Sequence, residues 1–414
     1  MSSKVLEVAV VGAGPAGVGM AVALRRHGVR RLAVIDRHQV GASFLSWPQE
    51  TRFITPSFYS NPFGLADLNA ITETSSPALS AGMEHLDGPR YAQYLARVAQ
   101  AHDLPLAPGC EVSALTRGAR GEFRLQTSKG VALARAVVWA TGEYQYPDLR
   151  PFAGAADCVH YAEVDSWSAF DADEYLVVGG YESGVDAAVN LVAGGARVQL
   201  LARKSTWDPA SPHDPSLSLS PYSRQRLYQA LDSGRLEIAF GVNVVEARRR
   251  DAGFTVRAED GRTFTTAQPP ILGTGFLRGG GAQVIRDAFD WTPDGRPILT
   301  EHDESTLMPG LFLAGPQVRQ EQRIYCFIYK FRQRFDGVAR TIAQHLGLPP
   351  PEPAAGGAWG PFGNADCCDE PANVERQRDR RGCVQCARAP LNRLAPRWCW
   401  PGWRTPASRP CSAA

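Results

Sequence analysis

Three glycines near the N-terminus, Gly12, Gly14 and Gly17, form the pattern G-A-G-P-A-G between an apolar run and a stretch typical of a helix. In such a turn the first glycine permits a tight bend, the second lets backbone amides approach a pyrophosphate, and the third lets helix and strand pack closely. The start of the helix adds unpaired N–H groups and a partial positive charge for the anion. The pattern therefore predicts a dinucleotide site.

A carboxylate follows where such a site needs one. Asp36 ends the next apolar run, at about the 20-residue distance from which a carboxylate accepts hydrogen bonds from the adenosine ribose. Its charge would repel a 2′-phosphate, so FAD or NAD is expected at this turn and not NADP. A glycine-rich turn without a ligand is the alternative.

Two units of strand, helix and strand are expected to position these residues. The first comprises a strand over 5–11, a helix over 16–27 and a strand over 31–36, because apolar runs bounded by glycine suit a parallel sheet covered on both faces. The second starts at Tyr175 and ends near 271–276. Between and after them we expect a helix over 89–102, antiparallel strands over 110–140, strand-like segments at 298–300 and 311–315, and a helix over about 322–346.

The order of five motifs resembles that of the two-dinucleotide-domain FAD/NAD(P)H oxidoreductase superfamily. This superfamily includes flavin-containing monooxygenases, Baeyer–Villiger enzymes and thioredoxin-reductase-like proteins, among them the bacillithiol-disulfide-reductase-like proteins. The resemblance spans residues 5–346 and rests on G-A-G-P-A-G, the A-T-G of 140–142, G-G-Y-E-S-G at 179–184, G-T-G-F at 273–276 and L-F-L-A-G-P at 311–316. It implies that the first motif holds FAD and that Gly315 turns toward the flavin. Many relatives follow this glycine with an Asp where this chain has Pro316, so that contact is missing or is supplied elsewhere.

The resemblance also implies that NADPH binds at the second glycine motif. Arg203 and Lys204 follow its second strand, where a carboxylate would indicate NAD, and two cations there can neutralise a 2′-phosphate. Two solvated surface charges are the alternative. Tyr181 replaces the glycine that lets the backbone approach the pyrophosphate, so either the turn is rearranged or the nucleotide binds weakly. The residues expected to contact the two cofactors are Gly12, Gly14, Pro15, Ala16, Gly17, Asp36, Arg37, Trp47, Ala140, Thr141, Gly142, Gly179, Ser183, Gly184, Arg203, Lys204, Gly315 and Pro316.

These elements predict an α/β fold with two Rossmann-like, three-layer domains, the NAD(P)H-binding one inserted into the FAD-binding one. We expect the FAD-binding domain over 1–150 and 281–348 and the NAD(P)H-binding domain over 165–280. Residues 349–414 combine a Pro/Gly-rich linker with a tail rich in Cys and Arg, for which disorder is expected. Cys367–Cys368 and C-V-Q-C at 383–386 also allow a metal site or a shuttle dithiol, although they match zinc patterns weakly; no metal is predicted.

Reduced flavin passes electrons to oxygen, to a disulfide or to an organic acceptor, depending on what the protein places beside it. The preferred hypothesis is an NADPH-dependent monooxygenase of a small molecule, because Asn61 and Trp47 occupy the region that faces the flavin in monooxygenase-like relatives. Phe152, Gly154 and His160 loosely match a monooxygenase fingerprint, but a His-Tyr pair also precedes the second glycine motif in bacillithiol-disulfide-reductase-like proteins. His160 as a structural residue is an equal alternative.

Two other functions remain open. One is NADPH-driven reduction of a low-molecular-weight disulfide or a quinone, although the chain lacks the C-x-x-C of thioredoxin-reductase-like enzymes in the expected regions, and Cys110, Cys158 and Cys326 stand alone in the sequence. Isolated thiols of this kind are more often buried small hydrophobes than redox centres. The other is a flavin-binding sensor without turnover, which Tyr181 and Pro316 slightly favour.

Composition restricts the partners. A net charge of +2 and a hydrophobic fraction of 44% over 414 residues give no bias toward nucleic acid or a membrane surface, so the partner is expected to be a small molecule. The apolar run over 8–24 is interrupted by glycines and proline, and we identify no export signal and no membrane helix in it. A cytoplasmic protein, with a homodimer possible, is expected.

Overall fold

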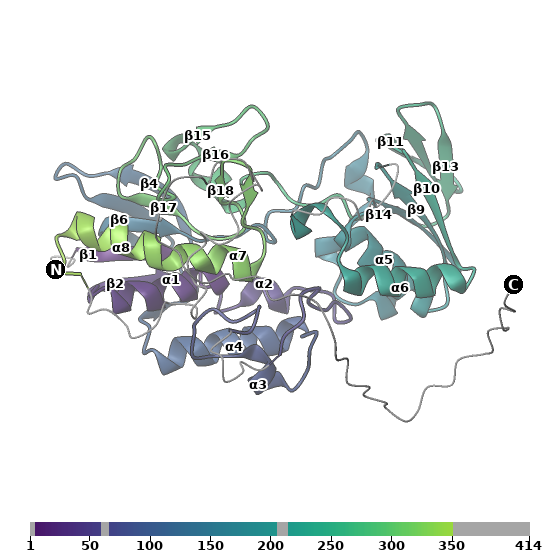
Figure 1. The fold of residues 1–414 in the computed structure, drawn as a ribbon. Coiled ribbons are helices and arrows are strands. Elements are labelled where there is room, and N and C mark those ends of the chain that lie inside the picture. The colour runs from purple at the N-terminus through teal and green to yellow at the C-terminus, as the bar shows by residue number, and fades with distance from the viewer. Residues whose placement is uncertain (1–4, 59–65, 205–213, 351–414) are drawn as a thin grey trace, which may run out of the picture. The chain divides into compact units, whose positions relative to one another are not determined.

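The structure is a computed structural model that describes residues 5–58, 66–204 and 214–350. Asn61 and the cysteine-rich tail lie outside these residues, so the predictions made for them stay predictions. The chain begins with a mixed sheet in the strand order β3-β2-β1-β6-β5-β4, to which β17 adds by pairing with β6 (Figure 1). The bounds of these strands are β1 Leu6–Val11, β2 Leu32–Ile35, β3 Leu106–Ala107, β4 Val112–Arg117, β5 Phe123–Thr127, β6 Gly130–Trp139 and β17 Leu311–Leu313.

The long strand β6 joins two kinds of pairing. Its first half pairs antiparallel with β5, and its second half lies parallel between β1 and β17. Side chains alternate between the two faces of a strand, and β1 shows this directly. Val8 and Val10 belong to the core beneath the helices, whereas Ala9 and Val11 face a second core that contains Ile285. Both faces of the strand are buried, as the continuous apolar run predicted.

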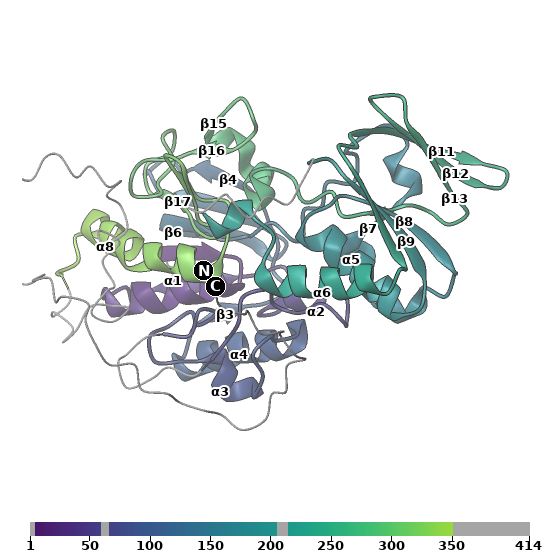
Figure 2. The same ribbon diagram turned by 45° about the vertical axis from the view of Figure 1, so that its right-hand side comes forward.

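Helices cover one face of this sheet. Helix α1 (Pro15–Arg26) begins with a proline in its first turn, where the missing N–H costs nothing. It lies beside α8 (Phe335–Leu346) in both ribbon views (Figures 1 and 2). A Cβ atom at Gly19 would lie 2.1 Å from the ring of Phe335, so a glycine is what permits this close approach. The remaining helices of this part are α2 Ala42–Leu45, α3 Pro77–Ala81, α4 Gly88–Ala101 and α7 Ile328–Phe331.

The second sheet has the order β10-β9-β8-β14-β7, and every pair in it is parallel. Helices α5 (Glu182–Ala193) and α6 (Pro221–Asp232) pack on it, and a three-stranded antiparallel sheet, β11-β12-β13, follows in the chain. The strands are β7 Val159–His160, β8 Glu174–Val178, β9 Arg197–Ala202, β10 Leu236–Phe240, β11 Val244–Arg250, β12 Gly253–Ala258, β13 Thr263–Thr266 and β14 Ile271–Leu272. All of them lie between β6 and β17 in sequence, which confirms the α/β fold with one Rossmann-like unit inserted into another. The exact domain boundaries stay a prediction.

The helix expected over 322–346 begins later than predicted. Residues 319–324 instead form a hairpin of β18 (Arg319–Gln320) and β19 (Arg323–Ile324), with Glu321 in the left-handed region at φ 52°. A tertiary contact holds this hairpin, because the Gln320 side chain donates to Asp303 Oδ1 at 2.6 Å. Helical structure resumes at α7, and two further strands, β15 (Asp290–Trp291) and β16 (Pro297–Ile298), precede β17.

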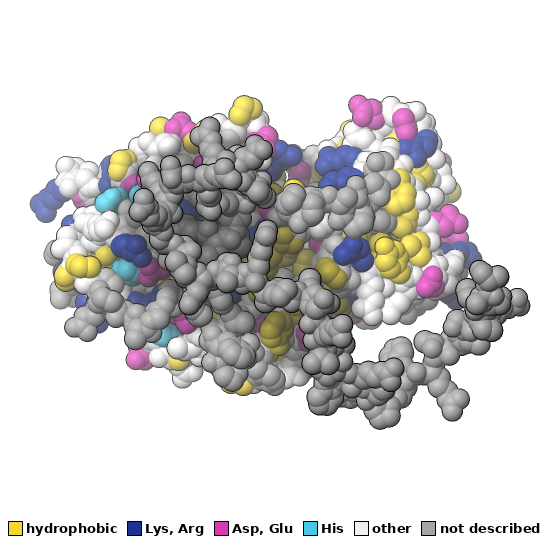
Figure 3. Space-filling view, in the orientation of Figure 1, with side chains coloured by type: hydrophobic (Ala, Val, Ile, Leu, Met, Phe, Trp, Pro, Cys, Tyr) yellow, Lys and Arg dark blue, Asp and Glu magenta, His cyan; other side chains and the backbone are white. Residues whose placement is uncertain are grey.

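On the face seen in Figure 3, acidic and basic side chains are interspersed among the described residues. Within the described part of the chain, no helix is both long and apolar enough to span a membrane.

Candidate functional site

A cavity of about 420 Å³ opens at the carboxyl end of the first sheet. Its walls come from the first glycine turn, the end of β2, the loop after α2, the segment that follows β6, the start of α5 and the segment before α7. The predicted cofactor residues that line it are Gly12, Gly14, Pro15, Ala16, Asp36, Arg37, Trp47, Ala140, Thr141, Gly142, Ser183 and Pro316. Pockets at this edge of an open α/β sheet are where such folds bind ligands.

The first glycine turn has the geometry that a pyrophosphate requires. Gly12 has φ 107°, and a Cβ there would lie 2.3 Å from the Ala140 carbonyl oxygen. A Cβ at Gly17 would lie 1.8 Å from the carbonyl oxygen of Gly12, so this glycine lets α1 pack against the turn. A Cβ at Gly14 would meet no atom within 4 Å, which leaves open space in front of the helix N-terminus. The residues present therefore fit the pyrophosphate of FAD.

One end of the cavity, where the adenosine of FAD is predicted to bind, is lined by Asp36, Arg37, Cys110 and Glu111. Asp36 accepts hydrogen bonds from the backbone N–H groups of Ala13 at 2.6 Å and His38 at 2.7 Å. These bonds fix the carboxylate beside the glycine turn and leave lone pairs for ribose hydroxyls. The Arg37 Nε donates to Gln145 Oε1 at 2.7 Å, so this arginine ties β2 to the segment after β6.

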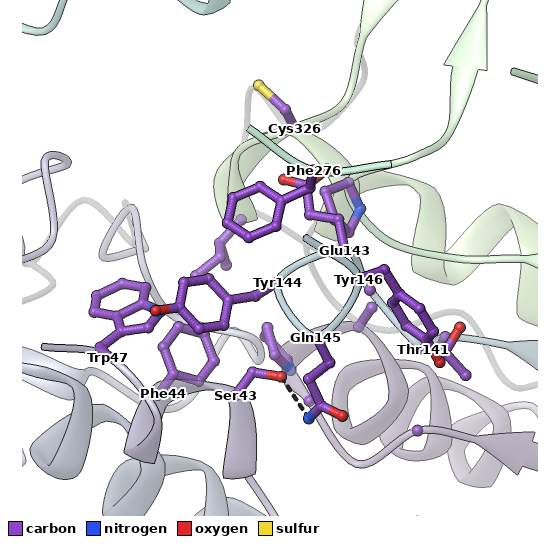
Figure 4. A pocket seen from close by; sticks show the side chains of 18 of the residues that line it. Ser43, Phe44, Trp47, Thr141, Glu143, Tyr144, Gln145, Tyr146, Phe276 and Cys326 are labelled. Carbon is purple, nitrogen blue, oxygen red and sulfur yellow. Dashed lines mark hydrogen bonds between the residues drawn. The ribbon is translucent and has the colours of Figure 1, made fainter. Parts of the chain in front are cut away.

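The distal end of the cavity is formed by Trp47, Tyr144, Phe276 and Cys326 (Figure 4). The Tyr144 ring centroid lies 6.3 Å from that of Trp47 and 5.2 Å from that of Phe276. Flat aromatic walls of this kind suit a planar ring system. The role of Trp47 as a flavin contact stays a prediction.

The turn at Gly315, predicted to face the flavin, contacts a carboxyl group that lines the cavity. Gly315 has φ 109°, and a Cβ there would lie 3.2 Å from the Cβ of Ala16, so the turn abuts the first glycine motif. Pro316 lines the cavity where an Asp was expected by resemblance. The next residue is Gln317. Its side-chain nitrogen donates to Glu143, and its side-chain oxygen Oε1 accepts from Gly279 N at 2.9 Å. Burial raises the pKa of Glu143, although the Arg319 charge and the Gln317 bond lower it in part.

Cys326 is not isolated in space. Its thiol donates to the Ser216 hydroxyl at 3.0 Å, and the Lys330 ammonium donates to the same oxygen at 2.7 Å and also pairs with Asp214. Burial raises the pKa of the Cys326 thiol, whereas the Ser216 hydrogen bond and the Lys330 charge lower it. By contrast, Cys158 is half-buried against the core of the second sheet, and burial raises its pKa to about 12.

The second glycine motif is built like the first. Gly179 has φ 117°, and a Cβ there would lie 2.3 Å from the carbonyl oxygen of Gly273. A Cβ at Gly184 would lie 1.6 Å from the carbonyl oxygen of Gly179, so α5 packs on the turn as α1 does. Arg203 and Lys204 are exposed just past the end of β9. Their predicted contact with a 2′-phosphate stays a prediction.

Tyr181 is accommodated without rearrangement of the turn. It has φ −123°, a conformation that any residue adopts, so no glycine is required by the backbone. Its side chain leaves the turn, and its hydroxyl is 2.9 Å from the carbonyl oxygen of Ser216 and 2.8 Å from that of Ser218. The Lys204 Nζ lies 5.8 Å from the centre of the Tyr181 ring.

His160 has the surroundings of a structural residue. It is 1% exposed, its Nε2 is 3.0 Å from the carbonyl oxygen of Gly275, and its Nδ1 accepts from Ala162 N at 3.1 Å. Burial lowers its pKa, so the neutral ring is favoured. The neighbouring Tyr161 hydroxyl donates to Asp186 Oδ2 at 2.8 Å, as does the Thr51 hydroxyl, which links the two Rossmann-like units.

Comparison with known proteins identifies the family. A family model described as pyridine nucleotide-disulphide oxidoreductase matches residues 9–315. The chain belongs to the pyridine nucleotide-disulphide oxidoreductase family. Membership confirms the predicted superfamily and its cofactors, FAD and NADPH.

The chain is similar in sequence to one reductase and in fold to a disulfide reductase and a monooxygenase. The bacilliredoxin reductase Bdr of Bacillus subtilis is 25% identical over 344 residues, which cover 81% of this chain and 97% of the relative. A solved bacillithiol disulfide reductase from Staphylococcus aureus has a TM-score of 0.66 at 19% identity, over 82% of this chain and 98% of that one. A flavin-containing monooxygenase from Stenotrophomonas maltophilia has the same TM-score at 18% identity, over 82% and 99%. These two structural likenesses show the shared fold.

Several cavity residues were not predicted from the sequence. Glu143, Tyr144 and Gln145 follow the A-T-G motif directly, so extending that motif would have found them. Phe276 closes the G-T-G-F motif in the same way. Cys326 and its neighbour Ser216 carry no such signal, because 110 residues separate them in the chain.

Proposed function

We propose that this oxidoreductase uses NADPH and FAD to reduce a low-molecular-weight disulfide, with Cys326 as the attacking thiol. One observation carries the proposal: the thiol at the distal end of the cofactor cavity shares the Ser216 hydroxyl with the Lys330 ammonium. The kinship with a bacilliredoxin reductase along nearly the whole of that relative supports the same chemistry.

The surroundings of Cys326 suit thiol–disulfide exchange. The thiolate is the nucleophile in this reaction, and nearby positive charge and hydrogen-bond donors favour it. Lys330 supplies the charge, and the Ser216 hydroxyl can rotate to donate to the sulfur once the thiol has lost its proton. Cys326 is half-buried and lines the cavity at its distal end.

The reaction balances with the groups present and the known cofactors. The Cys326 thiolate attacks one sulfur of the disulfide, a mixed disulfide forms, and the leaving thiolate takes a proton. Glu143 is a candidate source of that proton, because burial favours its protonated form. When bound, FAD would supply the electron pair from NADPH that reduces the mixed disulfide, and a second proton would complete the release of two thiols for each NADPH consumed.

The test compares two single serine variants, and then a double serine variant of the tail, in the full-length, FAD-bound protein. In an oxygen-free assay with a small disulfide, Cys326→Ser should lose at least about 100-fold of the disulfide-dependent NADPH consumption, as expected when an attacking nucleophile is removed. Cys158→Ser, a half-buried thiol away from the cavity, is the matched control and should retain wild-type activity. Bleaching of the flavin by NADPH should be unchanged in both.

Two outcomes would overturn the proposal. If Cys326→Ser reduces disulfides at the wild-type rate, the thiol is not the nucleophile. If that activity disappears in a Cys383→Ser/Cys386→Ser variant and persists in Cys326→Ser, the chemistry belongs to the tail dithiol.

An oxygenase is the second candidate, favoured by the aromatic wall of Trp47, Tyr144 and Phe276 beside the cavity. Asn61, on which the monooxygenase hypothesis depended, lies outside the described residues, so that hypothesis stays a prediction. An oxygenase would consume NADPH with oxygen and a nucleophilic substrate, independently of Cys326. A flavin-binding sensor would show no bleaching by NADPH under either condition.

A further inference from the structure

One short segment connects the second glycine motif to the thiol at the distal end of the cavity. In this segment, Asp214–Ser218, the carbonyl oxygens of Ser216 and Ser218 accept from the Tyr181 hydroxyl at 2.9 and 2.8 Å. The side-chain hydroxyl of Ser216 accepts from the Cys326 thiol at 3.0 Å and from the Lys330 ammonium at 2.7 Å. The network therefore runs from α5 to the segment before α7.

Tyr181 is the residue that departs from the dinucleotide pattern, and the structure shows what its side chain does instead. The residue is 36% exposed, yet its hydroxyl contacts two backbone carbonyl oxygens of a segment whose regular structure is a single 3-10 turn, Pro215–Leu217. The hydroxyl has a single hydrogen, which the two carbonyl oxygens share, and this shared hydrogen bond restrains the backbone of the segment. Without it Ser216 has fewer restraints on its distance from Cys326.

We propose that Tyr181 and Ser216 are positioning residues for the Cys326 thiol: Tyr181 fixes the backbone of the segment, and the Ser216 hydroxyl then holds the thiolate beside the cavity. The assignment rests on the proposed function of Cys326 as the nucleophile. It also depends on the cavity that Cys326 lines. The glycine turn of that cavity fits a pyrophosphate whether or not the thiol reacts.

Other charged and titratable groups also surround the thiol. Lys330 and Arg319 lower the pKa of Cys326, and Glu143 raises it. The phenol groups of Tyr181 and Tyr329 and the carboxylate of Asp214 complete the set. The positioning role is therefore measured as the change that each hydroxyl makes against this fixed background.

The experiment measures alkylation of Cys326 by iodoacetamide in the full-length, FAD-bound protein from pH 5 to 10, with peptide mass spectrometry to separate it from the other cysteines. Ser216→Ala should move the midpoint of the rate profile up by about one pH unit, roughly a tenfold slower reaction at pH 7. Tyr181→Phe should move it in the same direction by a smaller amount. Ser216→Thr, which keeps a hydroxyl, should restore most of the wild-type profile.

Two matched controls accompany these variants. Ser218→Ala removes a hydroxyl from the same segment but keeps the carbonyl oxygen that Tyr181 contacts. Tyr228→Phe removes the hydroxyl of a tyrosine on α6 that is 60% exposed. Both should leave the profile unchanged.

The outcomes separate this proposal from the proposed function. A Ser216→Ala profile that matches the wild type, or a Cys326 that iodoacetamide does not label at any pH, would refute the positioning role. A shifted profile combined with disulfide reduction that survives Cys326→Ser would leave the positioning role in place and overturn the proposed function, because alkylation needs no turnover.

Discussion

Gly14→Ala separates ligand binding from folding at the first glycine turn. An added Cβ at this position meets no protein atom within 4 Å, and the residue has φ −80°, which alanine adopts without strain. Alanine is a slightly poorer N-cap than glycine, but it also reduces the entropy of the unfolded chain, so the two effects largely cancel. The free energy of unfolding of the apoprotein should change by less than about 0.5 kcal/mol.

The same methyl group should weaken FAD binding, because it occupies the space in front of the helix N-terminus. Forcing a methyl group into a packed contact costs about 1–3 kcal/mol, which corresponds to a Kd for FAD raised by roughly 5- to 150-fold. Isothermal titration of the apoprotein with FAD measures the affinity, and thermal unfolding of the apoprotein measures stability. Gly17→Ala is the contrasting control: its Cβ would lie 1.8 Å from the Gly12 carbonyl oxygen, so it should destabilise the apoprotein as well. Wild-type FAD affinity in a stable Gly14→Ala protein would show that no pyrophosphate approaches Gly14.

Three further predictions concern other parts of the molecule. Arg203→Ala should raise the KM for NADPH about tenfold, because one charge-assisted contact is lost, and should leave the KM for NADH unchanged. Arg197→Ala, at the start of β9, is the control. Equal KM values for NADPH in variant and wild type would contradict the 2′-phosphate contact. Thr51→Val removes a buried hydroxyl that contacts Asp186 and Tyr161, and it should lower the free energy of unfolding by about 1–3 kcal/mol. Thr265 is exposed, so Thr265→Val should change this free energy by less than about 0.5 kcal/mol. Urea unfolding measures both variants. The pKa of Asp336 is lowered from 3.8 to about 2, first by its hydrogen bond to His27, so the carboxylate stabilises the fold above pH 3.8 and that stability is lost as the pH falls through about 2. Asp336→Asn should therefore cost about 2 kcal/mol at neutral pH, with a deficit that shrinks by roughly half at pH 3; a deficit independent of pH would refute this.

The sequence by itself determined the two glycine turns, because these turns depend on short-range geometry. The inserted order of the two Rossmann-like units and the cofactor pair followed instead from the family resemblance that the five ordered motifs carry. Gly12 and Gly179 need positive φ angles and leave no room for a Cβ, and both requirements are met within a single strand, turn and helix. Continuous apolar runs then identify strands that are buried on both faces.

The tertiary structure decided what stands at the distal end of the cavity. Tyr181 and Ser216 belong to the inserted Rossmann-like unit and Cys326 to the other, and packing of the two units brings the Cys326 thiol within hydrogen-bond distance of the Ser216 hydroxyl. The Tyr181 hydroxyl donates to the backbone carbonyl oxygen of Ser216, which is 35 residues away in the chain. The late start of helical structure after residue 322 has the same origin, because a contact with Asp303 holds the chain in a hairpin. No local sequence pattern predicts these long-range contacts, because each depends on how distant segments pack around a shared core.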